Sequence, residues 1–198
     1  MNSRKRKKPW RRSINFVVIA LFIVLVIVGI LMFAYRTYRQ KTIRDDTKIT
    51  EPTGIESLEK VTLGGVDQWI LIRAEDQSKP VLLWLHGGPG SPTMPLASQH
   101  DMELVKHFVV VHWDQRGAGK SYSPEIPTST MVVDQFVSDT YELTQVLAER
   151  FDVPRIYLIG HSWGSQVGIL TIARHPDVYY AFVALGQFVH SAEGDAVG

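Results

Sequence analysis

The chain has 198 residues, 45% of them hydrophobic and 21% charged, which is typical of one globular domain with an additional apolar segment. It contains no cysteine, and this excludes disulfide bonds, thiolate metal ligands and a cysteine nucleophile. The net charge of +1 hides an asymmetry, because basic side chains gather near the N-terminus while the remainder is mildly acidic. These basic residues are Arg4, Lys5, Arg6, Lys7, Lys8, Arg11 and Arg12.

No charged residue occurs from Ile14 to Tyr35. As a helix, about 22 residues at about 1.5 Å each would cross a hydrocarbon core of about 30 Å. We therefore predict a transmembrane helix over residues 14–35, with the basic tail of residues 1–13 in the cytoplasm and the rest outside the cell membrane. The alternative is a cleaved signal peptide, but its apolar core is usually only about 7–15 residues, and Met32-Phe33-Ala34 matches a cleavage site poorly.

Residues 36–57 are polar, lack clear periodicity and contain Pro52-Thr53-Gly54, so we interpret them as a stalk or linker. A globular domain is predicted over residues 58–198. It begins with a hairpin signal around Gly64-Gly65-Val66-Asp67, flanked by short strands at 61–63 and 68–72.

The domain continues with continuously apolar strands alternating with helical segments. Strands are expected at 81–85, 108–113, 155–159 and 178–185, and helices at 96–106, 134–151 and 163–175. This alternation predicts an α/β fold with a mostly parallel sheet and right-handed crossovers. The last strand forms an apolar edge that ought to be paired.

The strand before residue 160 breaks into Gly-x-Ser-x-Gly and continues as a helix. A serine at the tip of such a sharp turn has a strained backbone, and its neighbours two residues away must be small. Gly160 and Gly164 meet that demand around Ser162. The pattern alone is a weak signal, but a buried strand before it and a helix after it make it strong. We predict Ser162 as a catalytic nucleophile.

Acyl transfer to a serine needs hydrogen-bond donors for the oxyanion that develops. One is expected from the backbone N–H of Trp163, and the second from the glycine-rich loop His86-Gly87-Gly88-Pro89-Gly90 after the strand at 81–85. Gly88 is the preferred donor and Gly87 the second choice. The alternative is that this loop is only a tight strand-to-helix turn.

The segments HGGPGSP, DQRGAGKS and GHSWGS follow in that order, each at a strand end. Over residues 58–187 the chain resembles the α/β-hydrolase fold, most closely the proline iminopeptidase (prolyl aminopeptidase) family. The resemblance implies a serine hydrolase with a Ser, Asp, His triad and no metal or other cofactor, acting on small peptides with an N-terminal proline or on related amides and esters. It also implies a turn that braces the site, formed by Asp114, Arg116, Gly117, Gly119 and Ser121. Family members usually have glycine where this chain has His161.

Gly119-Lys120-Ser121 also imitates the end of a phosphate-binding loop. That motif needs a glycine where the chain has Asp114, and a helix directly afterwards. Pro124 and Pro127 disfavour such a helix. We therefore expect no nucleotide partner, and we interpret the basic tail as a topology signal rather than a nucleic-acid site.

In this fold the triad follows the chain order serine, acid, histidine. Of the candidates after Ser162, His175 and Asp177 lie a helix length away, roughly 15 Å, and His190 precedes Asp195 in the wrong order. We expect the acid, the base, the last strands and any helical cap to be missing, as in an N-terminal fragment or truncated product with negligible activity. The alternatives are a non-catalytic membrane-tethered binding module, or a general esterase or lipase.

Overall fold

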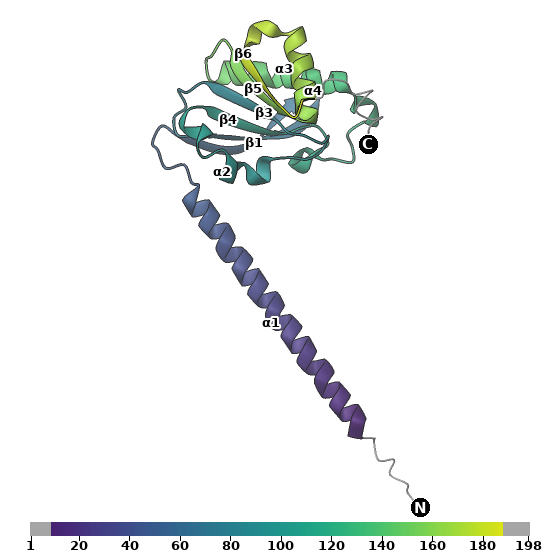
Figure 1. Cartoon of the computed structure of the whole chain (residues 1–198). Coiled ribbons are helices and arrows are strands. Elements are labelled where there is room, and N and C mark those ends of the chain that lie inside the picture. Colours follow the sequence, from purple (N-terminus) through teal and green to yellow (C-terminus); the bar gives the residue numbers. More distant parts are fainter. Residues whose placement is uncertain (1–8, 188–198) are drawn as a thin grey trace, which may run out of the picture. The chain divides into compact units, whose positions relative to one another are not determined.

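Figure 1 shows the chain as a computed structural model, which describes residues 9–187. Contacts divide the chain into two units, one ending at Asp46 and one beginning at Thr47. The first unit contains a single helix. The second contains a six-stranded sheet with helices on both faces.

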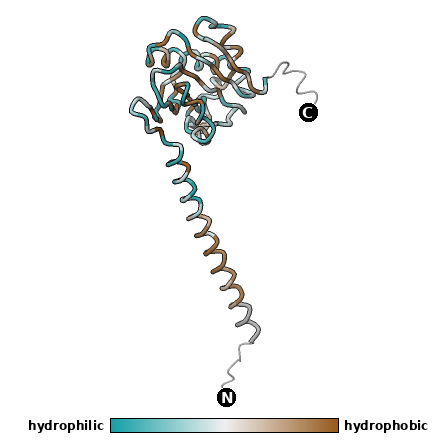
Figure 2. The backbone as a smooth tube through the Cα atoms, turned by 60° about the vertical axis from the view of Figure 1, so that its left-hand side comes forward, coloured by the Kyte–Doolittle hydropathy of each residue, from teal (hydrophilic) through white to brown (hydrophobic). Residues whose placement is uncertain are grey.

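Helix α1 (Pro9–Asp46) has 38 residues and includes the whole apolar stretch predicted to cross a membrane. Residues 16–46 contain a window of mean hydropathy 3.5 and are long enough to span a bilayer. Figure 2 shows apolar residues along the middle of α1 and hydrophilic residues toward its C-terminal end. A signal sequence near an N-terminus can also meet these criteria of length and hydropathy, so the helix is a candidate span.

Most of the segment interpreted as a stalk or linker, residues 36–57, is regular structure, which its lack of clear periodicity did not predict. Residues 36–46 continue α1, because extending an existing helix adds one hydrogen bond per residue without repeating the cost of nucleation. The hydroxyls of Thr37 and Thr42 donate to the carbonyls four residues earlier, at 2.9 and 3.1 Å. The polar side chains of this segment are therefore compatible with a helix.

Strand β1 (Ile55–Leu63) pairs antiparallel with β2 (Val66–Ala74), and this confirms the hairpin. Both strands are longer than predicted, and β1 begins inside the expected linker. Its residues alternate between half-buried and exposed, as in a strand with one face against the core. Gly64 and Gly65 connect the strands with φ of 52° and 74°, conformations that favour glycine in a two-residue hairpin turn.

The sheet has the strand order β1-β2-β4-β3-β5-β6. Its other strands are β3 (Val81–Leu85), β4 (Val109–Asp114), β5 (Ile156–His161) and β6 (Tyr179–Leu185). These four pair in parallel, and only β2 joins β4 in antiparallel orientation. The mostly parallel sheet is thereby confirmed. β4 lies on one side of β3, and β5, the next strand along the chain, lies on the other side. The strand order therefore reverses between β3 and β5. Ligands commonly bind at the carboxyl ends of strands at such a switch point.

Helices α3 (Val133–Arg150) and α4 (Trp163–Arg174) cover one face of the sheet, and the short α2 (Ala97–His100) covers the other (Figure 1). The larger apolar core lies under α3 and α4, and a smaller cluster lies on the α2 face. Leu83 of β3 belongs to the larger core, whereas its neighbour Leu82 belongs to the smaller cluster. Successive strand residues therefore serve opposite faces, as the continuous apolar runs require.

The single helix predicted over residues 96–106 is wrong. The segment forms two 3-10 turns, Met94–Leu96 and Leu104–Lys106, on either side of α2. Asp101 follows α2, is 1% exposed and forms a buried ion pair with Arg73 of β2. Burying this charge beside its partner fixes the chain at the end of α2 and interrupts the helix.

Candidate active site

Ser162 lies between β5 and α4, with φ of 51° and ψ of −116°. Few non-glycine residues adopt such a conformation, which costs about 1–3 kcal/mol that surrounding contacts must offset. The Ser162 N–H donates to the carbonyl of Leu185 at 2.8 Å, and its carbonyl accepts the Ser165 hydroxyl at 2.6 Å. The serine is thus held on a sharp strand-to-helix turn, the geometry expected of a nucleophile elbow.

Gly160 and Gly164 leave no room for side chains. A Cβ on Gly160 would lie 2.3 Å from the carbonyl oxygen of Gly164, and a Cβ on Gly164 would lie 2.3 Å from that of Leu85. Neither distance is compatible with a side chain at an unshifted backbone. The two glycines therefore let α4 approach the ends of β3 and β5, which sets the position of Ser162.

The loop after β3 passes beside Ser162. Leu85 pairs with Gly160, so the loops that follow β3 and β5 begin at the same level of the sheet. A Cβ on Gly87 would lie 3.3 Å from the Cβ of Ser162. The backbone of the predicted oxyanion loop is therefore in contact distance of the serine.

The loop reverses the direction of the chain at residues 88–90. Gly88 and Gly90 have φ of 114° and 84°, values that side chains disfavour, and Pro89 lies between them. The Ser91 N–H donates to the carbonyl of Gly87 at 3.1 Å and closes the loop. The structure thus brings residues 86–90 to the elbow as one compact turn.

Two backbone N–H groups near Ser162 could serve as oxyanion donors. Trp163 is the first residue of α4, where a helix N–H has no intrahelical acceptor. Gly88 directly follows the close approach of Gly87 to the serine. The N-terminus of α4 also carries partial positive charge, which favours an oxyanion at this position.

Gln115 joins three segments of the site, and no sequence motif singled it out. It is 1% exposed. Its backbone N–H donates to Nε2 of His86 at 3.1 Å, and its side-chain amide donates to the His86 carbonyl at 3.0 Å. Its side-chain oxygen accepts the indole N–H of Trp163 at 3.2 Å. The loop after β3, the turn after β4 and the start of α4 are thereby tied together.

His86 is held as a neutral imidazole. Its Nε2 accepts the Gln115 N–H, so the proton lies on Nδ1, which donates to the carbonyl of Gly87 at 2.9 Å. Burial lowers the pKa of His86 below its ordinary value, although the Gly87 hydrogen bond and the Asp114 charge partly oppose this. Both ring nitrogens are used to orient the loop.

Asp114, Gly119 and Ser121, at the two ends of the predicted bracing turn, join β4 to β2. The Asp114 carboxylate accepts the Lys120 N–H at 2.8 Å, and its carbonyl accepts the Ser121 hydroxyl. Ser121 Oγ in turn accepts the N–H of Trp69 at 2.8 Å. Gly119 has a φ of 50°, and a Cβ there would lie 2.2 Å from the Asp114 carboxylate. Burial raises the pKa of Asp114.

Arg116 and Gly117 lie in the middle of the turn. The Arg116 guanidinium makes two hydrogen bonds to the Asp139 carboxylate of α3, at 2.9 and 3.0 Å, and both side chains are fully buried. It also donates to the carbonyl of Leu63 at 3.0 Å. Gly117, with a φ of 74°, lets the chain turn back. The turn therefore braces the β1–β2 hairpin against α3.

Two of the other described histidines have side-chain contacts with residues other than Ser162. His112 lies 3.4 Å from the Asp101 carboxylate, and His175 stacks on Tyr141. His175 follows the 12 residues of α4, about 18 Å along the helix axis. The exposed His161 lines a separate cavity of about 490 Å³ on the α2 face with Trp84. The other acid and base candidates, His190, Glu193 and Asp195, lie outside the described residues.

Residues 9–187 contain no group of three or more His, Cys, Asp and Glu side chains that could hold a metal ion. Gly119–Ser121 forms one 3-10 turn, and the next α-helix begins only at Val133. The phosphate-loop motif needs a helix at that point. Within the described part of the chain, we assign no residues to a metal or nucleotide.

The contact of α4 with β3 predicts different tolerances for two glycines of one helix. Gly164→Ala should lower the free energy of unfolding by more than about 3 kcal/mol, because the methyl group meets backbone. Gly168→Ala should cost less, about 1 kcal/mol, because its methyl group would meet the Phe182 ring at 2.6 Å and a ring can move. Urea unfolding of the full chain in detergent measures both, and equal losses would contradict this packing.

The low pKa of His86 predicts a pH dependence of stability. The unfolded chain takes up a proton near pH 6.5, whereas the folded chain does so only at the lowered pKa. The free energy of unfolding should therefore fall as pH decreases from about 6.5 toward that pKa. The fall should be shallower in His86→Asn and unchanged in a variant of the exposed His107, His107→Asn. The raised pKa of Asp114 has the opposite effect on the free energy of unfolding at lower pH. The measurement should therefore compare the pH slope of each variant with that of the wild-type chain. An unchanged slope in His86→Asn would refute the assignment.

Comparisons with known proteins agree with this geometry. Residues 76–195, more than half of the chain, match the family described as serine aminopeptidase, S33. The probable aminopeptidase YbaC of Bacillus subtilis (strain 168) is 36% identical over 148 residues, which are 75% of this chain and 46% of that protein. A probable proline iminopeptidase of Leptolyngbya boryana is 34% identical over 111 residues, 56% of this chain and 32% of that protein.

Solved structures give the same fold. A proline iminopeptidase-related protein from Thermus thermophilus matches with a TM-score of 0.56 and 28% identity, over 66% of this chain and 44% of that chain. An epoxide hydrolase from Vigna radiata matches with a TM-score of 0.55 and 26% identity, over 65% of this chain and 39% of that chain. The chain thus spans less than half the length of these relatives. It belongs to the serine aminopeptidase S33 family and has the α/β-hydrolase fold.

Proposed function

We propose that this chain carries the nucleophile of a membrane-anchored serine hydrolase similar to proline iminopeptidases, and that the acyl-enzyme forms on Ser162. The observation that carries the proposal is the backbone of Ser162, with φ of 51° at the junction of β5 and α4. In a nucleophile elbow this strained turn exposes the serine hydroxyl above the sheet, where it can attack a carbonyl group.

The reaction would proceed in two steps. Ser162 Oγ attacks the substrate carbonyl carbon and loses its proton to a general base, while the carbonyl oxygen takes up negative charge. The N–H groups of Trp163 and Gly88 stabilise this oxyanion, and the returning proton leaves with the amine or alcohol. Water then hydrolyses the acyl-enzyme. Gln115 and His86 act as positioning residues, because their hydrogen bonds hold the loop, the turn and the helix in register.

The general base is proposed to come from outside residues 9–187. Within that part of the chain, the hydrogen bonds of histidine rings go to groups other than Ser162. A serine without a base is poorly activated, so these residues alone should react slowly. The substrate class is a small peptide, amide or ester. An N-terminal proline is suggested by the relatives that are described as proline iminopeptidases.

A fluorophosphonate probe tests the nucleophile. The full chain in detergent should be labelled at Ser162 about 10²- to 10⁴-fold more slowly than the Bacillus subtilis relative, because a general base contributes about that factor. Mass spectrometry should place the label on Ser162, and Ser162→Ala should abolish it, whereas Ser91→Ala in the neighbouring loop should not.

Two results would overturn parts of this proposal. Labelling spread over several serines without preference for Ser162 would remove it as nucleophile and favour a non-catalytic binding module. Labelling as fast as that of the relative would show that the chain itself supplies a base.

The anchor is proposed to be the apolar part of α1, residues 14–35, with the basic tail in the cytoplasm and the hydrolase domain outside. Seven basic residues precede the apolar stretch, while Arg36, Arg39, Lys41 and Arg44 after it are accompanied by Asp45 and Asp46. Positive charge favours the cytoplasmic side, so the stronger cluster sets the orientation.

The natural absence of cysteine makes this topology easy to test. Glu103→Cys, at a side chain that is 82% exposed, should react with a membrane-impermeant maleimide in intact cells. Asn2→Cys should react only after permeabilisation. The reverse pattern would contradict the orientation, and loss of the Asn2→Cys segment from the mature protein would indicate a cleaved signal peptide.

A further inference from the structure

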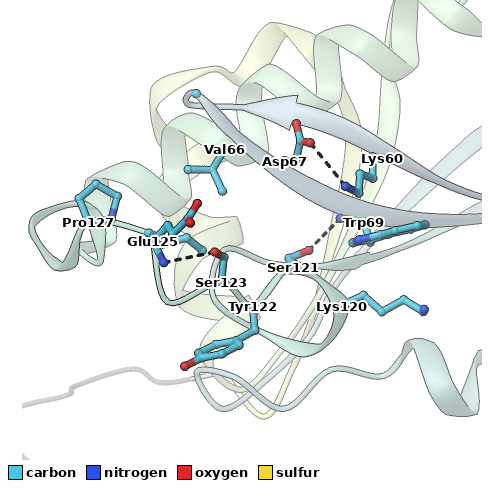
Figure 3. A pocket seen from close by; sticks show the side chains of 12 residues that line it. Lys60, Val66, Asp67, Trp69, Lys120, Ser121, Tyr122, Ser123, Glu125 and Pro127 are labelled. Atoms are coloured by element: carbon cyan, nitrogen blue, oxygen red, sulfur yellow. Dashed lines mark hydrogen bonds and ion pairs between the residues drawn. The ribbon is translucent and has the colours of Figure 1, made fainter.

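A second cavity, of about 470 Å³, lies beside the β1–β2 hairpin (Figure 3), where Trp69 pairs with the last residue of β4. One wall is the hairpin, with Lys60, Asp67 and Trp69. The other is the segment of residues 120–127 that follows the bracing turn. Neither the proposed chemistry nor the bracing role explains the side chains that line it.

The two walls are fixed to each other at the base of the cavity. Ser121 Oγ accepts the Trp69 N–H at 2.8 Å, a contact drawn in Figure 3. The same hydroxyl donates to the Asp114 carbonyl, and the Asp114 carboxylate accepts the Lys120 N–H at 2.8 Å. The backbone of Trp69 is therefore fixed relative to the start of residues 120–127 by buried and partly buried hydrogen bonds.

Two lysine ammonium groups lie near the Trp69 ring, and they differ in whether a carboxylate is paired with them. The Nζ atoms of Lys60 and Lys120 lie 5.6 and 5.1 Å from the centre of the Trp69 ring. Lys60 is neutralised by Asp67 at 3.6 Å. Within residues 9–187, no carboxylate lies within ion-pair distance of Lys120 Nζ. Lys120 is thus the cation available to a ligand.

Glu125 and Tyr122 also line the cavity. Among the described residues, the Glu125 carboxylate has no ion-pair partner, and the Tyr122 side chain is largely exposed. A ligand with one carboxylate and an apolar or aromatic group next to it matches Lys120 together with the ring of Trp69. Glu125 disfavours a second negative charge on the same ligand.

The register of the sheet relates this cavity to the serine. Trp69 pairs with Asp114, and the pairings of Leu85 with Trp113 and with Gly160 place His86 and His161 in the same row. From β2 to β5 the row crosses three strand spacings of about 4.8 Å, or about 14 Å. An extended peptide covers that distance with about four residues at about 3.3 Å each.

We propose that this cavity binds the C-terminal carboxylate of a short peptide whose scissile bond lies at Ser162. The inference rests on the proposed function for the location of the other end of the peptide. The Lys120 ammonium pairs with the carboxylate, and the ring of Trp69 contacts the last side chain. Peptides with about four residues after the scissile bond span both sites.

Calorimetric titration of the full-length Ser162→Ala chain in detergent tests this, because that variant cannot form the acyl-enzyme. The ligands are Pro-Gly-Gly-Gly-Phe as the free acid and as the C-terminal amide. The acid should bind about three- to tenfold more tightly than the amide, and the difference should shrink as salt is raised. Lys120→Gln should abolish the preference, whereas Lys60→Gln, which removes the neutralised lysine beside the same ring, should preserve it.

Equal binding of acid and amide, or equal loss of preference in both lysine variants, would overturn the proposal. Inorganic phosphate that binds as tightly as the peptide and competes with it would reassign the cavity to simple anions. A matching urea midpoint for the two lysine variants controls for folding. Fluorophosphonate labelling of the wild-type chain separates the hypotheses: labelling at Ser162 without an acid preference refutes only the carboxylate site, and an acid preference without labelling refutes only the nucleophile.

Discussion

The close approach of α4 to the end of β3 is the constraint that holds the whole site together. Gly164 rests against the carbonyl of Leu85, and a single methyl group there would overlap the strand. Only this proximity brings the loop after β3 within contact distance of Ser162, and the same loop supplies the proposed donor at Gly88. The strain in the Ser162 backbone is tolerated because β5 is paired with β3 on one side and β6 on the other, and because the Ser162 N–H donates to the Leu185 carbonyl at the end of β6.

Polar contacts then convert this packing into a rigid site. Gln115 links the loop after β3 to Trp163, while Arg116, one residue later, links the β1–β2 hairpin to α3 through Asp139. Adjacent residues of one turn therefore hold the site from both sides. Because each of these polar groups is buried, leaving any of them unpaired would cost about 1–3 kcal/mol, which makes the arrangement cooperative.

Similarity to known proteins supports the family and the fold of this chain, but it does not identify a substrate. Membership of the serine aminopeptidase family rests on residues 76–195 and on the shared fold, yet an epoxide hydrolase has nearly the same TM-score as a proline iminopeptidase-related protein. The fold supports different chemistries, so substrate preference depends on side chains around the serine. The cavity at Trp69 and Lys120, which we propose to bind the far end of a peptide, is built on the same turn that braces the site.

Local patterns of apolar residues and glycine were enough to predict the fold class, the six strands, the β1–β2 turn and the position of the Ser162 elbow. They did not predict the helix over residues 36–46, which forms by extension of α1, or the break at Asp101, which depends on Arg73 from a distant strand. The role of Gln115 and the joining of Trp69 to Ser121 emerged only once the chain was folded. Both depend on contacts between segments that are far apart in the chain, and no local pattern encodes such contacts.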